Sequence, residues 1–246
     1  MLWTWFAAIG GGSFVVVGAF VSIRLLLLWR RTRQLPELLL GLGLGLSGAI
    51  GYPVNAIARA VPPSDLQNLL YALSGVLAFS SQVAMLLFTW RVFRPAEGWA
   101  RAACVGLGAI GVGAFLWQTF ATGWAPFCKT ERGPWSITEV TQLVTLAWAG
   151  TESWLYHRKL VKRARLGLGD PITANRLLLW AISEFSAFTI TGTVSLLRVV
   201  GVPMTNVAIG VVIGPLGLTL AVAVWLAFLP PSRYTRWIAV RAQRES

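Results

Sequence analysis

The chain has 246 residues, of which 56% are hydrophobic and only 12% are charged, and its net charge is +12. Soluble domains carry about 25% charged residues, so this composition excludes an ordinary soluble protein and predicts an integral membrane protein. The basic residues gather beside apolar segments, and we therefore attribute the positive charge to membrane topology and not to nucleic-acid binding.

Seven apolar segments are each long enough to cross a bilayer as a helix. They cover residues 5–28, 38–58, 69–92, 102–122, 136–156, 177–199 and 207–229. The sequence thus predicts an all-α integral membrane protein, a seven-transmembrane helix bundle over residues 1–231. A basic, amphipathic cytoplasmic tail follows at 232–246, which we expect to lie on the inner membrane surface.

The distribution of basic residues predicts the orientation of this bundle. Of the 21 basic residues, all but four lie at the end that holds the connections after segments 1, 3, 5 and 7. The four exceptions are Arg59, Lys129, Arg132 and Arg198. By the positive-inside rule we expect the N-terminus outside and the C-terminus in the cytoplasm, in a plasma membrane or a bacterial inner membrane.

Several local patterns indicate where helices begin, pack and bend. Ser64-x-x-Gln67 and Ser136-x-x-Glu139 fit capping boxes, and Asp170-Pro171 fits an N-cap followed by proline. The glycines of 41–51 and the pair Gly210-x-x-x-Gly214 predict close helix packing. Within spans, "YPVN" (52–55) and "GPLG" (214–217) are the expected places of irregular backbone. Gly43-x-Gly45-x-x-Gly48 matches a dinucleotide fingerprint by letter, but that motif needs a soluble βαβ unit.

Polar residues inside the apolar segments form stripes on helical wheels. Polar stripes in a bilayer turn inward, so we expect segments 2, 5 and 6 to line the interior together. The stripes are Tyr52, Asn55 and Arg59 in segment 2; Thr138, Thr141, Gln142, Thr145, Glu152 and Tyr156 in segment 5; and Glu184, Thr191, Ser195 and Arg198 in segment 6.

Two intramembrane carboxylates carry the functional hypothesis. Glu152 and Glu184 are expected at comparable depth in the cytoplasmic half, where one must hold a proton or a cation or arginine must neutralise the pair. Arg24 is the nearest basic candidate within a span. For Glu152, a functional role and an ion pair with Arg24 that only fixes packing stay open; for Glu184 we favour function. The candidate ligand, ion or proton site comprises Glu184, Glu152, Thr191, Thr145, Gln142, Tyr52, Asn55 and Arg24.

A second candidate site lies at the outer ends of segments 2 and 6. Arg59 and Arg198, with the nearby polar groups of segment 2, would form an outward-facing pocket for an anion or a polar headgroup. The alternative, which we favour, is that these arginines pair with Asp65 or Glu139 at the surface.

The residue inventory limits the cofactors. Seven helices with an outside N-terminus are similar in topology to rhodopsins and receptors. However, the three lysines, Lys129, Lys159 and Lys162, all lie in connections and cannot form a Schiff base within the last helix. Two cysteines and one histidine make a haem, iron–sulfur or zinc site improbable. We therefore expect no cofactor and no metal.

These observations favour a bundle that binds or transports a small ligand, coupled to protons or cations through the glutamates. An alternative is a sensor or accessory subunit that signals through a membrane or cytoplasmic protein partner. Its docking surface for that partner, or for anionic inner-leaflet lipid, would be the basic connection after segment 5 (Arg158, Lys159, Lys162, Arg163 and Arg165). A third hypothesis is an enzyme acting on lipid with the glutamates as acid and base, although no nucleophile or metal cluster supports it.

Overall fold

The computed structural model describes residues 2–122, 134–202 and 207–245. All regular secondary structure in these ranges is helical, which confirms the predicted all-α class. In chain order the elements are α1 (Leu2–Thr32), α2 (Leu35–Leu44), the π-helical η1 (Gly45–Gly51), α3 (Tyr52–Ala60), α4 (Asp65–Phe93), α5 (Gly98–Thr122), α6 (Pro134–Arg165), α7 (Pro171–Val199), α8 (Val207–Phe228) and α9 (Ser232–Glu245).

Among the described residues, six helical stretches are long and apolar enough to cross a membrane. They are Ala8–Thr32, Leu35–Ala60, Asp65–Phe93, Gly98–Phe120, Pro171–Val199 and Gly210–Phe228. The chain is thus a multi-pass membrane protein in composition and helix length. The fifth predicted segment forms α6, which is 32 residues long. It is not among the six because its polar stripe lowers its mean hydropathy.

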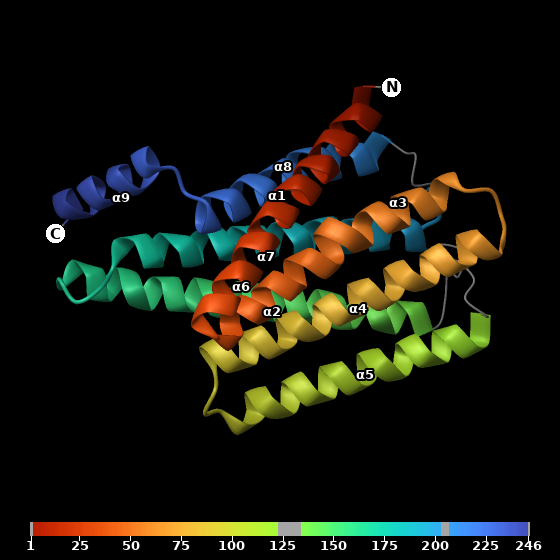
Figure 1. Ribbon diagram of the computed structural model, residues 1–246, viewed down its shortest axis with the longest axis horizontal. Helices are drawn as coiled ribbons and strands as arrows, with labels where there is room; N and C mark the ends of the chain where they lie inside the picture. Colours follow the sequence, from red (N-terminus) through yellow and green to blue (C-terminus); the bar gives the residue numbers. More distant parts are fainter. Residues whose placement is uncertain (1, 123–133, 203–206, 246) are drawn as a thin grey trace.

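The long helices pack as a closed ring with one helix outside it. In this ring each helix contacts the next in the order α1, α2, α4, α6, α7 and α8, and α8 in turn contacts α1. Helix α5 packs on the outer side of α4 and α6, while α3 contacts α4. Figure 1 shows the turns α1–α2, α4–α5 and α6–α7 at one end of the bundle, together with α9.

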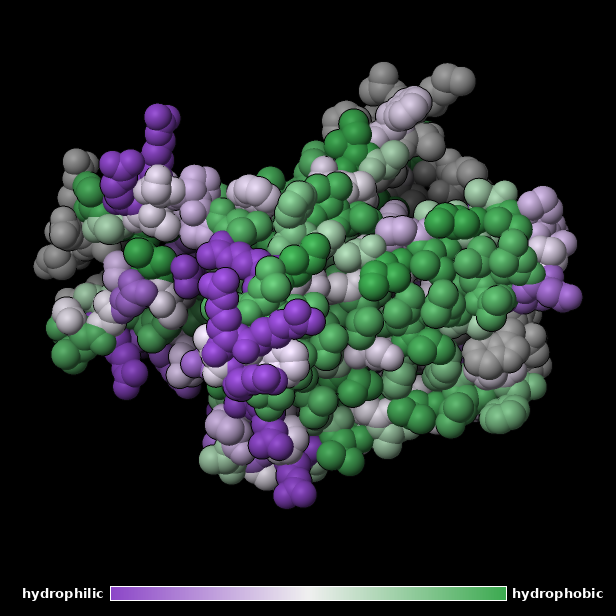
Figure 2. Space-filling view, viewed as in Figure 1, coloured by the Kyte–Doolittle hydropathy of each residue, from purple (hydrophilic) through white to green (hydrophobic). Residues whose placement is uncertain are grey.

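The core lies inside this ring, and the outer surface is also apolar. Figure 2 shows hydrophobic residues over most of the visible face and hydrophilic residues gathered at the end where α1 stops and α9 lies. Phe120 is 84% exposed and Trp5 is 69% exposed. A soluble protein rarely exposes such a continuous apolar surface, so hydrocarbon is the solvent that this face requires. The core comprises Val21, Leu25, Leu39, Leu40, Leu44, Ala84, Met85, Phe88, Phe93, Trp180, Leu220 and Val224.

The irregular backbone of the second predicted segment lies one turn earlier than expected. Instead of "YPVN", residues 45–51 form the π-helix η1, and Tyr52 and Pro53 begin α3. Proline has no N–H and its ring crowds the carbonyl four residues back, and a wider π turn relieves this conflict. Pro215, in contrast, lies inside a continuous α8.

Glycines bring the helices of the ring together, as predicted for the pattern at 41–51. A Cβ on Gly43 would lie 2.7 Å from Met85 Sδ on α4, and one on Gly48 would lie 3.0 Å from the ring of Phe14 on α1. Backbone meets backbone where α1 crosses α8, since a Cβ on Gly10 would lie 2.7 Å from the carbonyl oxygen of Gly214. Larger residues at these positions would force the helices apart.

Two of the three predicted helix starts are confirmed. Ser64 is the N-cap of α4 and accepts a hydrogen bond from Gln67 N at 3.3 Å. Asp170 caps α7 and accepts from the amides of Ile172 (3.0 Å) and Thr173 (3.1 Å). The third was wrong, because α6 begins at Pro134 and Ser136 is already within the helix.

The predicted tail forms the amphipathic helix α9, which packs against α7 and α6. Ile238 is buried, and Asn175 Nδ2 on α7 donates a hydrogen bond to Tyr234 Oη at 3.0 Å. Trp237 and Arg241 are exposed. The tail is therefore anchored to the bundle at the end that carries most of the basic residues.

Candidate functional site

Glu184 lies near the middle of α7 and is 6% exposed. Its Oε2 is buried and has no hydrogen-bond partner among the described residues. One helical turn earlier, Trp180 is also buried, and its indole Nε1 likewise has no described partner. The Trp180 ring contacts Phe88 of α4 and Phe228 of α8 edge-to-face, at centroid distances of 6.3 and 5.5 Å. A carboxyl group and an unused donor thus lie on one face of α7, beside the core.

Polar groups on α4 and α6 also meet at mid-helix. Gln82 Nε2 on α4 donates to Thr145 Oγ1 on α6 at 3.4 Å, and both residues are buried. Thr145 Oγ1 in turn donates to the carbonyl of Thr141 at 2.7 Å. This chain of hydrogen bonds links two helices of the ring and uses the donor of Thr145.

Glu152 has a different environment from Glu184. Arg94, the C-cap residue that follows α4, donates its Nε–H to both carboxylate oxygens of Glu152, at 2.9 and 3.0 Å. The side chain of Glu152 is 8% exposed and that of Arg94 is 27% exposed. This hydrogen bond, together with the charge of the carboxylate, raises the pKa of Arg94. The glutamate is therefore neutralised by one arginine that ties the α4–α5 turn to α6.

Aromatic contacts lie beside this ion pair. Arg94 Cζ lies 5.8 Å from the ring centroid of Trp99, which contacts Trp148 on α6. On the neighbouring side Phe93 contacts Tyr156 at 5.8 Å. The low exposure of the Glu152 side chain, 8%, strengthens the interaction between the two charges.

The ion pair of Glu152 with Arg24, one of the two alternatives left open, does not form. Arg24 is exposed, and its Nη1 donates to the carbonyl oxygen of Phe228 at 2.8 Å. It thus satisfies a carbonyl at the C-terminal end of α8, where a cation is also favoured by the helix dipole.

The structure does not bring segment 2 to the two glutamates. Tyr52 is exposed and its hydroxyl lies against Gly11 of α1, while Asn55 Nδ2 donates to Ser74 Oγ on α4 at 3.2 Å. The ring order explains this outcome, because α2 packs between α1 and α4, and α3 packs on α4, away from α6 and α7 in the part of the chain that the structure describes. The expectation that segments 2, 5 and 6 line one interior was wrong for segment 2.

The remaining candidates are scattered over α6 and α7. Gln142 is exposed, and Thr191 is half-buried with its carbonyl accepting from Ser195 Oγ at 2.7 Å. Within the described residues, no hydrogen bond or ion pair joins Glu184 to Glu152. Of the acids that the structure describes, Glu184 therefore remains as the buried one with an unused oxygen.

At the opposite end, Arg198 Nη1 lies 3.5 Å from Glu139 Oε1. This is the surface pairing favoured over an outer anion pocket. Arg59 is exposed on α3, in a different part of the ring from α7. The two arginines therefore do not form a shared pocket through contacts between their helices.

Two polar partners of the candidate residues were not predicted from the sequence. Arg94 lies just outside an apolar segment, whereas the sequence interpretation takes partners of Glu152 from the basic residues inside the spans. Gln82 is a single amide within the apolar stretch "SSQVAMLLF". Its position opposite the polar stripe of segment 5 was a signal that could have been used.

No protein-family model, curated protein or solved structure matches the chain. A functional assignment must therefore come from the chemistry of the buried residues.

Proposed function

We propose that the chain is a seven-span bundle, with its N-terminus outside and its C-terminus in the cytoplasm, that binds or transports a small ligand. In this proposal Glu184 is the protonatable centre that couples ligand occupancy to a proton or a cation. The observation that carries the proposal is the buried Oε2 of Glu184 without a described partner, one turn from the unused indole N–H of Trp180.

The energetics of burial support this role. An ionised carboxylate without a partner in a medium of low dielectric costs several kcal/mol, so Glu184 must hold a proton or receive a cation. A ligand that carries a cation can replace that proton, and the indole N–H of Trp180 supplies a donor for a polar group of the same ligand. Exchange between the two occupants would link binding to protonation.

Glu152 has a structural role in this proposal. Its charge is already matched by Arg94 at 2.9 Å, and removing either partner would leave the other without its counter-charge. The coupled site therefore contains one glutamate and not two.

The test is an infrared pH titration of the chain in lipid nanodiscs. We expect the wild type to show a protonated carboxyl band that titrates, and we expect Glu184→Gln to lack it. Glu97→Gln, which alters an exposed residue of the α4–α5 turn, is the matched control and should retain the band. Identical titrations of the wild type and Glu184→Gln would remove Glu184 from the proposal.

A second candidate function is a sensor or accessory subunit, favoured by the exposed basic residues Arg158, Lys159, Lys162 and Arg163 at the end of α6. Proton uptake by proteoliposomes that contain the chain alone, lost in Glu184→Gln, would favour transport. Stoichiometric co-purification of a protein partner, lost when these four residues are neutralised, would favour the second function.

A further inference from the structure

The turn between α4 and α5 contains a hollow that the proposed function does not use. It has a volume of about 430 Å³ and is lined by Trp90, Arg91, Pro95, Ala96, Glu97, Gly98 and Arg101. The stretches able to cross a membrane end at Phe93 and begin again at Gly98. The hollow therefore lies at the level where a bilayer places its headgroups.

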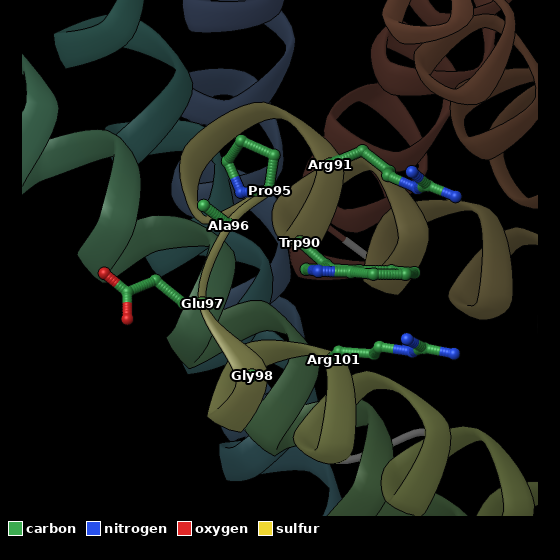
Figure 3. A pocket seen from close by; sticks show the side chains of 7 residues that line it. All are labelled: Trp90, Arg91, Pro95, Ala96, Glu97, Gly98 and Arg101. Carbon is green, nitrogen blue, oxygen red and sulfur yellow. The ribbon is translucent and has the colours of Figure 1, made fainter.

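Two arginines give this hollow its chemistry. Figure 3 shows that Arg91 and Arg101 extend in the same direction, from α4 and α5 respectively, with the indole of Trp90 between them. Arg91 Cζ lies 4.4 Å from the centroid of the Trp90 ring, so a cation–π contact orients this guanidinium. Both arginines are exposed, and neither forms a salt bridge within the described residues.

The neighbouring charges leave these two guanidiniums free to bind an anion. Figure 3 shows the carboxylate of Glu97 extending away from them. Arg94 in the same turn is already paired with Glu152. Because a guanidinium presents parallel N–H donors, two guanidiniums that extend the same way on either side of the Trp90 ring can both donate to a phosphate group at their open ends.

The surface beyond the hollow fits an acyl chain. Val105 and Val112 follow Arg101 at helical spacing along α5 and are 61% and 41% exposed. Between them, a Cβ on Gly106 or Gly108 would contact nothing within 4 Å. A lipid whose phosphate is held at the open ends of the two guanidiniums can thus extend its chains along an apolar and uncrowded helix face.

We propose that Trp90, Arg91 and Arg101 form a binding site for a phosphate group, supplied by an anionic phospholipid of the leaflet that faces this end of the bundle. Inorganic phosphate shares the chemistry of the headgroup. The apolar face of α5 favours the lipid as the source.

The experiment measures retention of added ligand by native mass spectrometry and the shift in melting temperature in detergent. The probes are dioleoyl-phosphatidic acid, dioleoyl-phosphatidylcholine and inorganic phosphate, each added to the full chain. Removing one arginine near a phosphate weakens binding by about fivefold, from ~1 kcal/mol per basic residue. We therefore expect Arg91→Gln/Arg101→Gln to lower the apparent affinity for phosphatidic acid by about thirtyfold.

The matched control is Arg30→Gln/Arg31→Gln, which removes two exposed arginines at the same end of the bundle and should leave retention unchanged. Equal stabilisation by inorganic phosphate, abolished by the same double variant, would confirm the site and assign it to free phosphate. Retention of phosphatidic acid that is equal in wild type and double variant would overturn the proposal. The melting temperature without ligand checks that the double variant is folded.

Discussion

Glu152 and Arg94 form the ion pair that attaches the α4–α5 turn to α6, and the two partners differ in exposure. Glu152 is the more buried of the two side chains. Removing Arg94 therefore leaves a carboxylate in a poorly hydrated place, whereas removing Glu152 leaves an arginine that can reach water. The consequences of the two substitutions should be unequal.

We expect Arg94→Met to lower the free energy of unfolding by about 3 kcal/mol and Glu152→Leu by about 1 kcal/mol. The double variant should be more stable than Arg94→Met alone, because it no longer buries an unpaired charge. Thermal unfolding in detergent of all four proteins completes a double-mutant cycle. Arg30→Met serves as the exposed control, and strictly additive effects would contradict the pairing.

At the scale of the element, α7 depends on its N-cap. Asp170 accepts hydrogen bonds from Ile172 N, Thr173 N and Thr173 Oγ1. Desolvation acts to raise the pKa of Asp170, but these hydrogen bonds and the nearby Arg176 outweigh it, so the pKa lies below its ordinary value. A carboxylate with a lowered folded pKa stabilises the protein above its unfolded pKa, which is about 3.9.

We therefore expect the contribution of Asp170 to be complete at neutral pH and to be lost as the pH falls below about 4, through the lowered folded pKa. Asp170→Ala should cost about 1 kcal/mol at pH 7. Asp170→Asn retains an acceptor at the cap but does not titrate. The melting temperature of the wild type should therefore fall more than that of Asp170→Asn between pH 6 and about pH 3. Parallel curves for these two proteins would mean that the cap does not titrate.

The crossing of α1 and α8 is a second feature at this scale, and α1 offers a matched pair of glycines. A Cβ on Gly10 would lie 2.7 Å from the carbonyl of Gly214, whereas a Cβ on Gly12 would meet nothing within 4 Å. Both substitutions to alanine change helix propensity equally. We expect Gly10→Ala to be less stable than Gly12→Ala by about 2 kcal/mol, measured by thermal unfolding. Equal stabilities would show that the crossing tolerates a methyl group.

The positions of the helices along the chain were largely predictable from the sequence, whereas the pairs of helices that pack against each other were not. Apolar runs and local capping residues such as Ser64 and Asp170 determine where helices lie and begin, and these are properties of short segments. A helical wheel also identified Glu184 as inward-facing. A helical wheel gives the inward face of a helix but not the helix that this face contacts. It therefore placed Asn55 with segments 5 and 6, although Asn55 contacts Ser74 on α4. For the same reason it could not identify Arg94 as the partner of Glu152. Such pairings depend on the order of helices around the ring.

At the scale of the whole molecule, the role of α6 decides the topology. If only the six more apolar stretches crossed the membrane, the termini would lie on one side. The basic end of α6 and the tail would then lie opposite to the arginines of the α1–α2 and α4–α5 turns. Figure 1 shows all of these segments at one end of the bundle. We therefore expect seven crossings, which would keep the basic residues of these segments in one compartment, as the positive-inside rule requires.

Single cysteines at three turns test this count in a variant in which Cys104 and Cys128 are replaced by serine. We expect an impermeant maleimide to label Ser64→Cys on intact cells, and to label Ala96→Cys and Leu168→Cys only after the membrane is opened. All three positions are exposed in the folded chain, so protection reports the compartment and not burial.

Ala96 and Leu168 are separated by α5 and α6, so they share a side only if both helices cross or neither does. Helix α5 is among the stretches able to span. Labelling of Leu168→Cys from outside, with Ala96→Cys protected, would therefore mean that α6 does not cross the membrane. It would also move the basic end of α6 to the outer face, where the positive-inside rule does not place it.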